Sequence, residues 1–195
     1  MKTLAITLSL LGFVLSNSSI LAQEVFPVFD YGEAKFNNVD TIPDFQSQNQ
    51  KLKITGTIYE DDGVTPAKDV LFYIEQADAY GDFDLRYKND RRYVYHSAWV
   101  KTAKDGRYTF YAFMPGNDRR YNQLKQIFPI IKTSKGEVYV LDSFLFEDDP
   151  LLSKLCRKKI KKKGDSTRIL KPRKIDKLLV VEKDIVLRQN LMYTK

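Results

Sequence analysis

The sequence has few of the residues that bind metal ions or cross-link a chain. Its 195 residues include one histidine, His96, and one cysteine, Cys156. A single cysteine excludes a disulfide within the chain, and a single histidine excludes a metal site that needs two imidazoles from one subunit. There is also no glycine-rich phosphate loop, and Ser97 lies outside any GxSxG motif. These absences argue against a nucleotide-binding P-loop and against a hydrolase nucleophile elbow.

Long hydrophobic runs are missing beyond the first residues. Lys2 precedes the apolar run LAITLSLLGFVL, which is followed by NSS and by a small-residue site at Ala22-Gln23. This order is typical of a secretory leader, and the run is shorter than the roughly 20 residues that span a bilayer. We therefore predict a signal peptide at 1–22, export to the periplasm or beyond, and no membrane-spanning segment. An uncleaved anchor is the alternative.

Most of the chain also lacks excess positive charge, although the whole sequence has a net charge of +7. Residues 23–153 contain 16 Lys and Arg against 21 Asp and Glu, whereas residues 154–174 contain 11 Lys and Arg against Asp165 alone. The positive charge is therefore concentrated in one basic segment, 154–174. This segment contains no aromatic residue that could stack on a base, which argues against nucleic acid as its partner.

An exported chain would instead meet the anionic surfaces and glycans of the cell envelope, and clustered Lys and Arg side chains attract such anions by charge. The candidate anion-binding residues are Arg157, Lys158, Lys159, Lys161, Lys162 and Lys163. The alternative is that 153–163 form a solvated helix at the edge of the domain, with Leu155 and Ile160 turned inward.

The mature chain is predicted to form an all-β domain. Residues 52–59 alternate apolar and polar side chains, as a half-buried strand does, and turns rich in Gly, Pro and Asp separate further apolar runs. Short strands at such regular spacing predict an antiparallel β-sandwich and not βαβ units. The predicted strands are 52–59, 69–78, 107–114, 127–133, 137–146 and 178–189.

Three segments are expected to depart from this regular pattern. Residues 23–50 mix aromatic and amide side chains with no lasting period, so we expect an irregular N-terminal arm before a sandwich at 51–195. Residues 81–99 are polar, aromatic and rich in arginine, which predicts a long loop. The basic segment is expected to add a short helix or loop insertion near the C-terminus.

Three stretches of the sequence resemble the intradiol ring-cleavage dioxygenases, most closely their short, exported bacterial branch. They are ITGTIYEDDGVTPAKDVLFYIEQADAYG at 54–81, WVKTAKDGRYTFYAFMPG at 99–116 and DSFLFEDDPLL at 142–152. The resemblance covers about 52–189 and implies a β-sandwich that cleaves catechol-type rings with a non-haem Fe(III). In that family two tyrosinates, two histidines and a water-derived ligand hold the iron. Hard phenolate oxygen suits Fe(III), and imidazole suits iron in general.

The resemblance also implies four ligand positions, and none of them holds tyrosine or histidine in this sequence. The positions are Phe83, Asp118, Gln126 and Phe128. A phenylalanine ring has no lone pair to donate, an amide oxygen is a weak ligand for a ferric ion, and one carboxylate does not hold Fe(III). We therefore predict no catalytic residue, no resident metal or other cofactor, and a role as a binding or structural module. The former iron cleft is expected to bind a small aromatic ligand or to be filled by side chains.

The alternative is an active Fe(III) dioxygenase with a rebuilt iron site. Tyr87, His96 and Tyr121 could in principle meet around a metal together with Asp118. The opposing interpretation is that the loop tyrosines pack against the sandwich and that His96, at the start of a strand, has a backbone hydrogen-bond partner.

Overall fold

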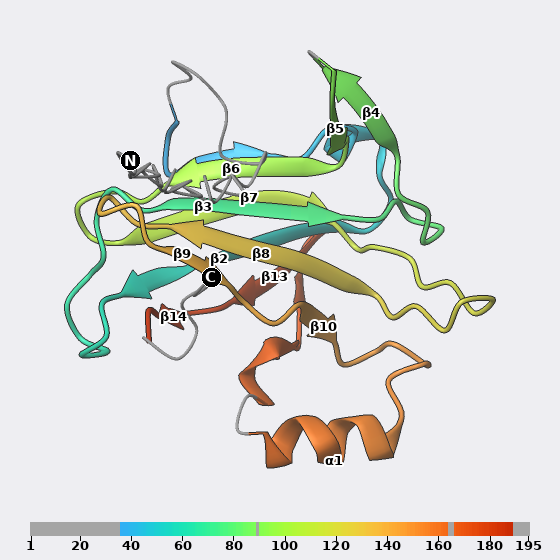
Figure 1. Cartoon of the computed structure of the whole chain (residues 1–195). Helices are drawn as coiled ribbons and strands as arrows, with labels where there is room; N and C mark the ends of the chain where they lie inside the picture. Colours follow the sequence, from blue (N-terminus) through green and yellow to red (C-terminus); the bar gives the residue numbers. More distant parts are fainter. Residues whose placement is uncertain (1–35, 89, 164–165, 189–195) are drawn as a thin grey trace, which may run out of the picture. The chain divides into compact units, whose positions relative to one another are not determined.

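Two β-sheets packed face to face make up the computed structural model, which describes residues 36–88, 90–163 and 166–188 (Figure 1). These residues all belong to one compact unit, Tyr31–Lys195. The predicted signal peptide at 1–22 lies outside the described residues. The first sheet has the strand order β1 (Val39–Thr41), β7 (Arg107–Phe113), β2 (Lys51–Tyr59), β13 (Leu178–Glu182) and β12 (Arg173–Ile175), and β14 (Ile185–Val186) also pairs with β2.

The second sheet faces the first across the core. Its strand order is β11 (Ile169–Leu170), β10 (Phe144–Phe146), β8 (Gln126–Lys132), β3 (Leu71–Gln76) and β6 (Ser97–Lys101), and β9 (Val138–Val140) also pairs with β8. A separate hairpin joins β4 (Leu85–Lys88) to β5 (Arg91–Val94). The predicted β-sandwich is confirmed.

The alternating apolar and polar residues of β2 lie on opposite faces of the strand. Leu52, Ile54, Gly56 and Ile58 are buried, whereas the residues that alternate with them are half-exposed. The facing strand β3 contributes Phe72, whose ring makes edge-to-face contacts with Tyr108 and Phe110 of β7 at centroid distances of 4.9 and 5.1 Å. Interlocked apolar side chains of this kind hold the two sheets together, since each buries its surface from water on folding.

The predicted antiparallel pairing holds for the central strands, but the two sheets are mixed. The central pairs β2–β7, β3–β6 and β3–β8 are antiparallel, whereas β1–β7, β2–β13, β2–β14 and β10–β11 are parallel. Parallel neighbours require a long connection. Here the chain visits the edge of the second sheet before β12 and β13 join the first, so β13 runs in the same direction as β2.

The N-terminal arm is less irregular than expected in its described part, 36–50. Its strand β1 adds to the edge of β7, where the Thr109 amide donates to the carbonyl oxygen of Asn38 at 2.8 Å. The Ile42 side chain that follows is buried in the core. A 3-10 helix, η2 (Phe45–Ser47), then leads toward β2. The arm is thus part of the domain because one apolar side chain and one strand anchor it.

The prediction of a long loop at 81–99 is wrong for most of these residues. The chain forms the hairpin β4–β5, which projects from the sandwich in Figure 1, and then enters β6 at Ser97. All four residues of β4 are exposed, and in β5 only Val94 is buried. A hairpin with both faces in water has no alternation of apolar and polar residues, so its sequence lacks the usual strand pattern.

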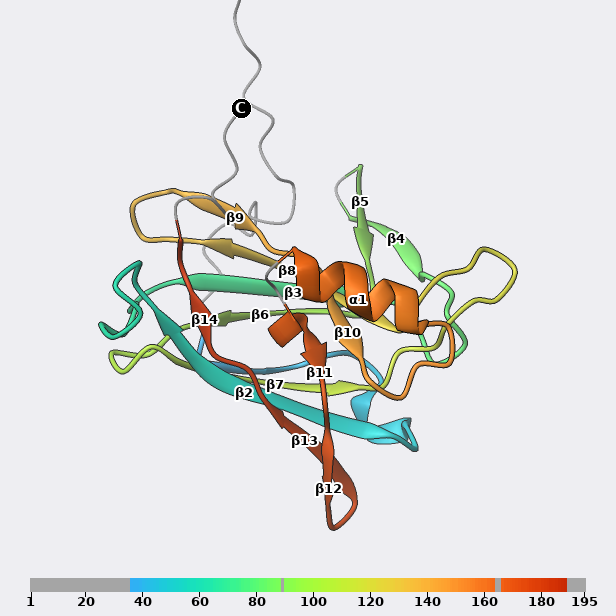
Figure 2. The same cartoon turned by 90° about the horizontal axis from the view of Figure 1, so that it is seen from below.

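The C-terminal part contains the predicted basic helix and two strands that the sequence did not indicate. Helix α1 (Lys154–Lys162) begins after Ser153, whose hydroxyl accepts from the Cys156 amide as an N-cap. A 3-10 helix, η3 (Ser166–Arg168), leads into β11, which together with β12 was not predicted. Figures 1 and 2 show α1 outside the sandwich, beside the β10–β11 edge of the second sheet. Among the described residues, no helix has the length and apolar character needed to cross a membrane.

A glycine in β2 permits the last strands to cross close to the sheet. β13 pairs with β2 as far as Thr55 and β14 resumes at Ile58, and between them the Lys183 backbone lies against Gly56. A Cβ at position 56 would come within 2.1 Å of the Lys183 carbonyl oxygen. The Tyr108 hydroxyl donates to that same oxygen at 2.5 Å, which fixes the crossing on its buried side.

We predict that Gly56→Ala destabilises the fold by about 1–3 kcal/mol, because a methyl group forced against backbone shifts both strands. Urea denaturation followed by circular dichroism measures this change. The control is Gly136→Asn in the turn between β8 and β9, where a Cβ meets nothing within 4 Å. Its cost should be about 1 kcal/mol or less, since Asn tolerates a positive φ. Equal losses for the two variants would contradict the close crossing at Gly56.

Candidate functional site

Two turns meet at the end of the second sheet where β3 ends and β8 begins. Gly81 lies in the turn after β3, with a positive φ of 97°, and Gly116 lies in the segment after β7. The Gly116 amide donates to the Asp78 carbonyl oxygen at 2.8 Å, and a Cβ on Gly116 would lie 2.4 Å from the Gly81 nitrogen. Phe83 and Asp118 each follow one of these glycines by two residues, so the contact brings both to the same end of the sheet.

Phe83 and Phe128 form an aromatic pair. Their ring centroids are 6.0 Å apart with an interplanar angle of 51°. Phe128 lies on β8 directly opposite Glu75 of β3, and its side chain is on the face of the sheet that points away from the core. Both rings are half-buried. Two of the four positions that the resemblance assigns to iron ligands thus contact one another as apolar groups.

Asp118 is the third position, and its carboxylate is bound to Arg120. The Arg120 guanidinium donates to Asp118 Oδ2 at 2.8 Å, and the Arg120 amide donates to Oδ1 at 2.8 Å. These hydrogen bonds hold the pKa of Asp118 below its ordinary value, and the bonds from the Arg120 side chain have the largest effect. Asp118 is also fixed by paired backbone hydrogen bonds with Gln123. Asp118 therefore helps to close a tight turn, through its backbone and through its carboxylate.

Gln126 is the fourth position, and its side chain belongs to a polar network. Its Oε1 accepts from the Ser143 hydroxyl at 3.0 Å, and that hydroxyl also accepts from Arg168 at 3.0 Å. Arg168 further donates to the Ser143 carbonyl oxygen and forms an ion pair with Asp142 at 2.9 Å. Gln126 thus joins β8 to the segment before β10 and to η3.

A carboxyl group that sequence reasoning missed lies beside these positions. Glu75 on β3 accepts a hydrogen bond from the Tyr73 hydroxyl at 2.6 Å, and the Tyr73 ring packs against Trp99 at 4.8 Å. No Lys or Arg of the described chain forms an ion pair with Glu75. Burial raises the pKa of Glu75, partly opposed by the hydrogen bond from Tyr73, and burial also raises the pKa of Tyr73. The only signal in the sequence was an acidic residue inside the apolar strand LFYIEQ.

The residues proposed for a rebuilt iron site differ in burial: one is buried and two are exposed. His96 is 6% exposed, with its Nε2 3.2 Å from the Asp44 carboxylate and its ring edge-on to Phe113. Tyr87 and Tyr121 are 71% and 79% exposed, on β4 and in the turn after β7. Within the described chain, no observed interaction links the three side chains. The opposing interpretation expected a backbone partner for His96 and packed loop tyrosines, and the structure corrects both expectations: the partner is the Asp44 carboxylate, and Tyr87 and Tyr121 are exposed.

The donor set at the four assigned positions does not fit a ferric ion. Two members are phenylalanines, one is a neutral amide in a hydrogen-bonded network, and the single carboxylate is paired with Arg120. Over the described ranges, no three His, Cys, Asp or Glu side chains are arranged to hold a metal ion.

The basic candidates on α1 divide into two kinds. Arg157 is half-buried and donates to the carbonyl oxygens of Leu152 and Glu147 at 3.2 and 2.6 Å, so its guanidinium fastens the helix to the domain. Leu155, expected to turn inward, is 73% exposed. The remaining candidates are exposed and form no ion pair with an acidic side chain of the described chain; they are Lys158, Lys159, Lys161, Lys162 and Lys163.

The fold is that of the intradiol ring-cleavage dioxygenases. The dioxygenase domain of a dioxygenase carbohydrate-binding protein fusion from Streptomyces sp. SirexAA-E matches with a TM-score of 0.57 and 18% identity, over 76% of this chain and 86% of that chain. An intradiol ring-cleavage dioxygenase from Tetranychus urticae matches with a TM-score of 0.55 and 16% identity, over 82% and 92% of the two chains.

A 3-chlorocatechol 1,2-dioxygenase from Rhodococcus opacus 1CP is also similar, with a TM-score of 0.54 and 17% identity over 75% of this chain and 63% of that chain. No protein-family profile and no curated protein sequence matches the chain. At these identities the structural likeness establishes the fold alone.

We predict that Glu75→Gln raises the free energy of unfolding at pH 7. Burial raises the folded-state pKa of Glu75 above its ordinary value of 4.5, so the carboxyl group contributes stability below about pH 4.5 that is lost as the pH rises. Glutamine imitates the protonated group and still accepts from Tyr73. The gain should disappear near pH 4 in urea titrations. The exposed Glu60→Gln is the control, and a loss of stability at pH 7 in Glu75→Gln alone would contradict the prediction.

Proposed function

We propose that this protein is a binding or structural module that has the fold of the intradiol dioxygenases but neither holds Fe(III) nor cleaves catechols. The observation that carries the proposal is the use of the four assigned positions. Phe83 and Phe128 contact each other, Asp118 is held by Arg120, and Gln126 accepts from Ser143. Each side chain thus has a role in packing or hydrogen bonding, and none of them supplies a phenolate or an imidazole.

A small aromatic ligand is the partner that best suits this end of the sheet. The rings of Phe83 and Phe128 are only half-buried, so part of their surface remains for stacking or edge contacts. Glu75 and the Tyr73 hydroxyl lie on the same face of β3 and would add polar groups to orient such a ligand. The site would then bind an aromatic molecule and leave it chemically unchanged.

The basic helix supports a second role, which is attachment to an anionic surface or glycan. The leader-like sequence at 1–22 supports export, and an exported chain would present the α1 lysines to envelope anions. The Streptomyces neighbour is a fusion with a carbohydrate-binding protein, so a sandwich of this fold is compatible with a protein that acts at a glycan surface.

Ferric reconstitution tests the loss of iron binding. We expect the purified chain, incubated with excess Fe(III) and desalted, to retain far less than one iron per chain and to show no visible tyrosinate-to-iron charge-transfer band. It should also leave catechol and hydroxyquinol unchanged under oxygen. An intradiol dioxygenase treated in parallel provides the positive control. About one iron per chain together with ring cleavage would refute the proposal in favour of a rebuilt iron site.

Binding of dextran sulfate tests the role of the helix. We predict that the variant K158Q/K161Q/K162Q binds at least about tenfold more weakly, because each Lys or Arg near an anionic surface contributes on the order of 1 kcal/mol. Binding should also weaken steeply with added salt. The control, K68Q/K104Q/K135Q, removes the same charge from exposed lysines elsewhere. Equal effects of both variants would show that net charge, and not α1, governs binding.

A further inference from the structure

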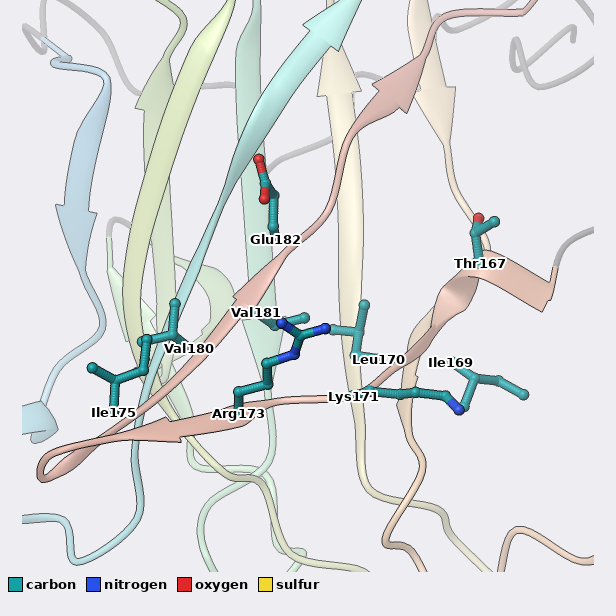
Figure 3. A pocket seen from close by; sticks show the side chains of 9 residues that line it. All are labelled: Thr167, Ile169, Leu170, Lys171, Arg173, Ile175, Val180, Val181 and Glu182. Atoms are coloured by element: carbon teal, nitrogen blue, oxygen red, sulfur yellow. The ribbon is translucent and has the colours of Figure 1, made fainter.

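A groove that none of the four assigned positions lines opens where the edges of the two sheets come together. β11 ends the second sheet and β12 ends the first, and only Lys171 and Pro172 connect them. The groove between β11 and the β12–β13 hairpin has a volume of about 470 Å³, within the range of roughly 300–1,000 Å³ that is typical of small-molecule sites. Figure 3 shows the side chains that line it.

The floor and walls of this groove are mainly aliphatic. Leu170 and Val181 are buried at its base, and Ile169 and Val180 are half-buried. Ile175 on β12 is 55% exposed. Exposed aliphatic surface of this kind gains free energy when a hydrocarbon chain covers it.

The polar groups of the groove favour an anion. Arg173 extends from β12 toward Val181 and Leu170 (Figure 3), and within the described chain it has no hydrogen-bond or ion-pair partner. Lys171 lies beside it and is paired with Glu147 at 2.6 Å. Glu182 is the one acidic residue in the lining. A guanidinium without a partner, next to aliphatic side chains, is suited to bind one carboxylate through two parallel hydrogen bonds.

We propose that this groove binds an amphipathic carboxylate, with the carboxylate on Arg173 and the hydrocarbon part on Ile175, Val180 and Leu170. The two sheet edges leave Ile175 exposed and Val180 half-exposed above the buried Leu170, and the Arg173 guanidinium lies at this apolar surface, where the head of such a ligand would lie. None of the four assigned positions lines this groove, and the proposal does not depend on whether the chain binds iron. It also differs from the α1 lysines, which offer charge without an aliphatic groove.

Isothermal titration calorimetry with octanoate, 1-octanol and acetate tests the proposal at low ionic strength. Octanoate should bind at millimolar concentration or below, and at least about tenfold more tightly than octanol, which lacks the charge, or acetate, which lacks the chain. Arg173→Gln should weaken octanoate binding about tenfold and leave octanol binding unchanged. Ile175→Ser should weaken both ligands several-fold, because it removes aliphatic contact and keeps the charge.

Two controls separate this site from general charge attraction. Lys174→Gln changes the neighbouring residue on β12, which does not line the groove, and should bind octanoate like the natural chain. K158Q/K161Q/K162Q should also retain octanoate binding. The proposal is overturned if octanoate does not bind, if octanol binds equally well, or if Lys174→Gln loses as much affinity as Arg173→Gln. Full binding by both Arg173→Gln and Ile175→Ser would overturn it as well.

Discussion

The close approach of two turns at Gly81 and Gly116 is the constraint on which the geometry of the candidate site depends. Any side chain at either glycine would collide with the backbone of the other turn, so the segments after β3 and β7 can approach this closely only with glycine at both positions. That contact sets where Phe83 and Asp118 lie relative to β8. In this chain the frame supports an aromatic pair, Phe83 and Phe128, and a turn closed by the ion pair of Asp118 with Arg120.

The central strands could be predicted from the sequence because they are half-buried. Alternation in β2 and the apolar runs of β7 and β8 indicate strands whose inner faces meet a core, and the structure confirms them. The hairpin at 85–94 could not be found in the same way, since water covers both its faces. The strands β11 and β12 lie in a sequence dominated by lysine and arginine, where β11 is defined by pairing with β10 and β12 by pairing with β13. Parallel pairing, too, depends on the path of the chain through both sheets.

The chemistry at the four assigned positions could be read from the sequence, because motif spacing identifies which residues stand there. Their partners could not. The hydrogen bond from Ser143 to Gln126 joins residues 17 positions apart. The Arg168 side chain, which donates to Ser143, comes from a third element, η3. Glu75 was overlooked because an acidic residue in a strand is normally solvated, and only the structure shows that Glu75 is half-buried, hydrogen-bonded to Tyr73 and opposite Phe128. The groove at Arg173 arises from two sheet edges that no local pattern connects.

The most direct measurement is the position of bound iron in crystals of the natural chain grown with excess ferric citrate. Anomalous difference maps at the iron absorption edge locate the metal independently of activity. We expect no peak near Phe83, Asp118, Gln126 and Phe128, and none that joins His96 to a tyrosine. A strong peak within bonding distance of two tyrosine hydroxyls and the His96 imidazole would contradict the central claim, because it would show that the sandwich has rebuilt a ferric site from other residues.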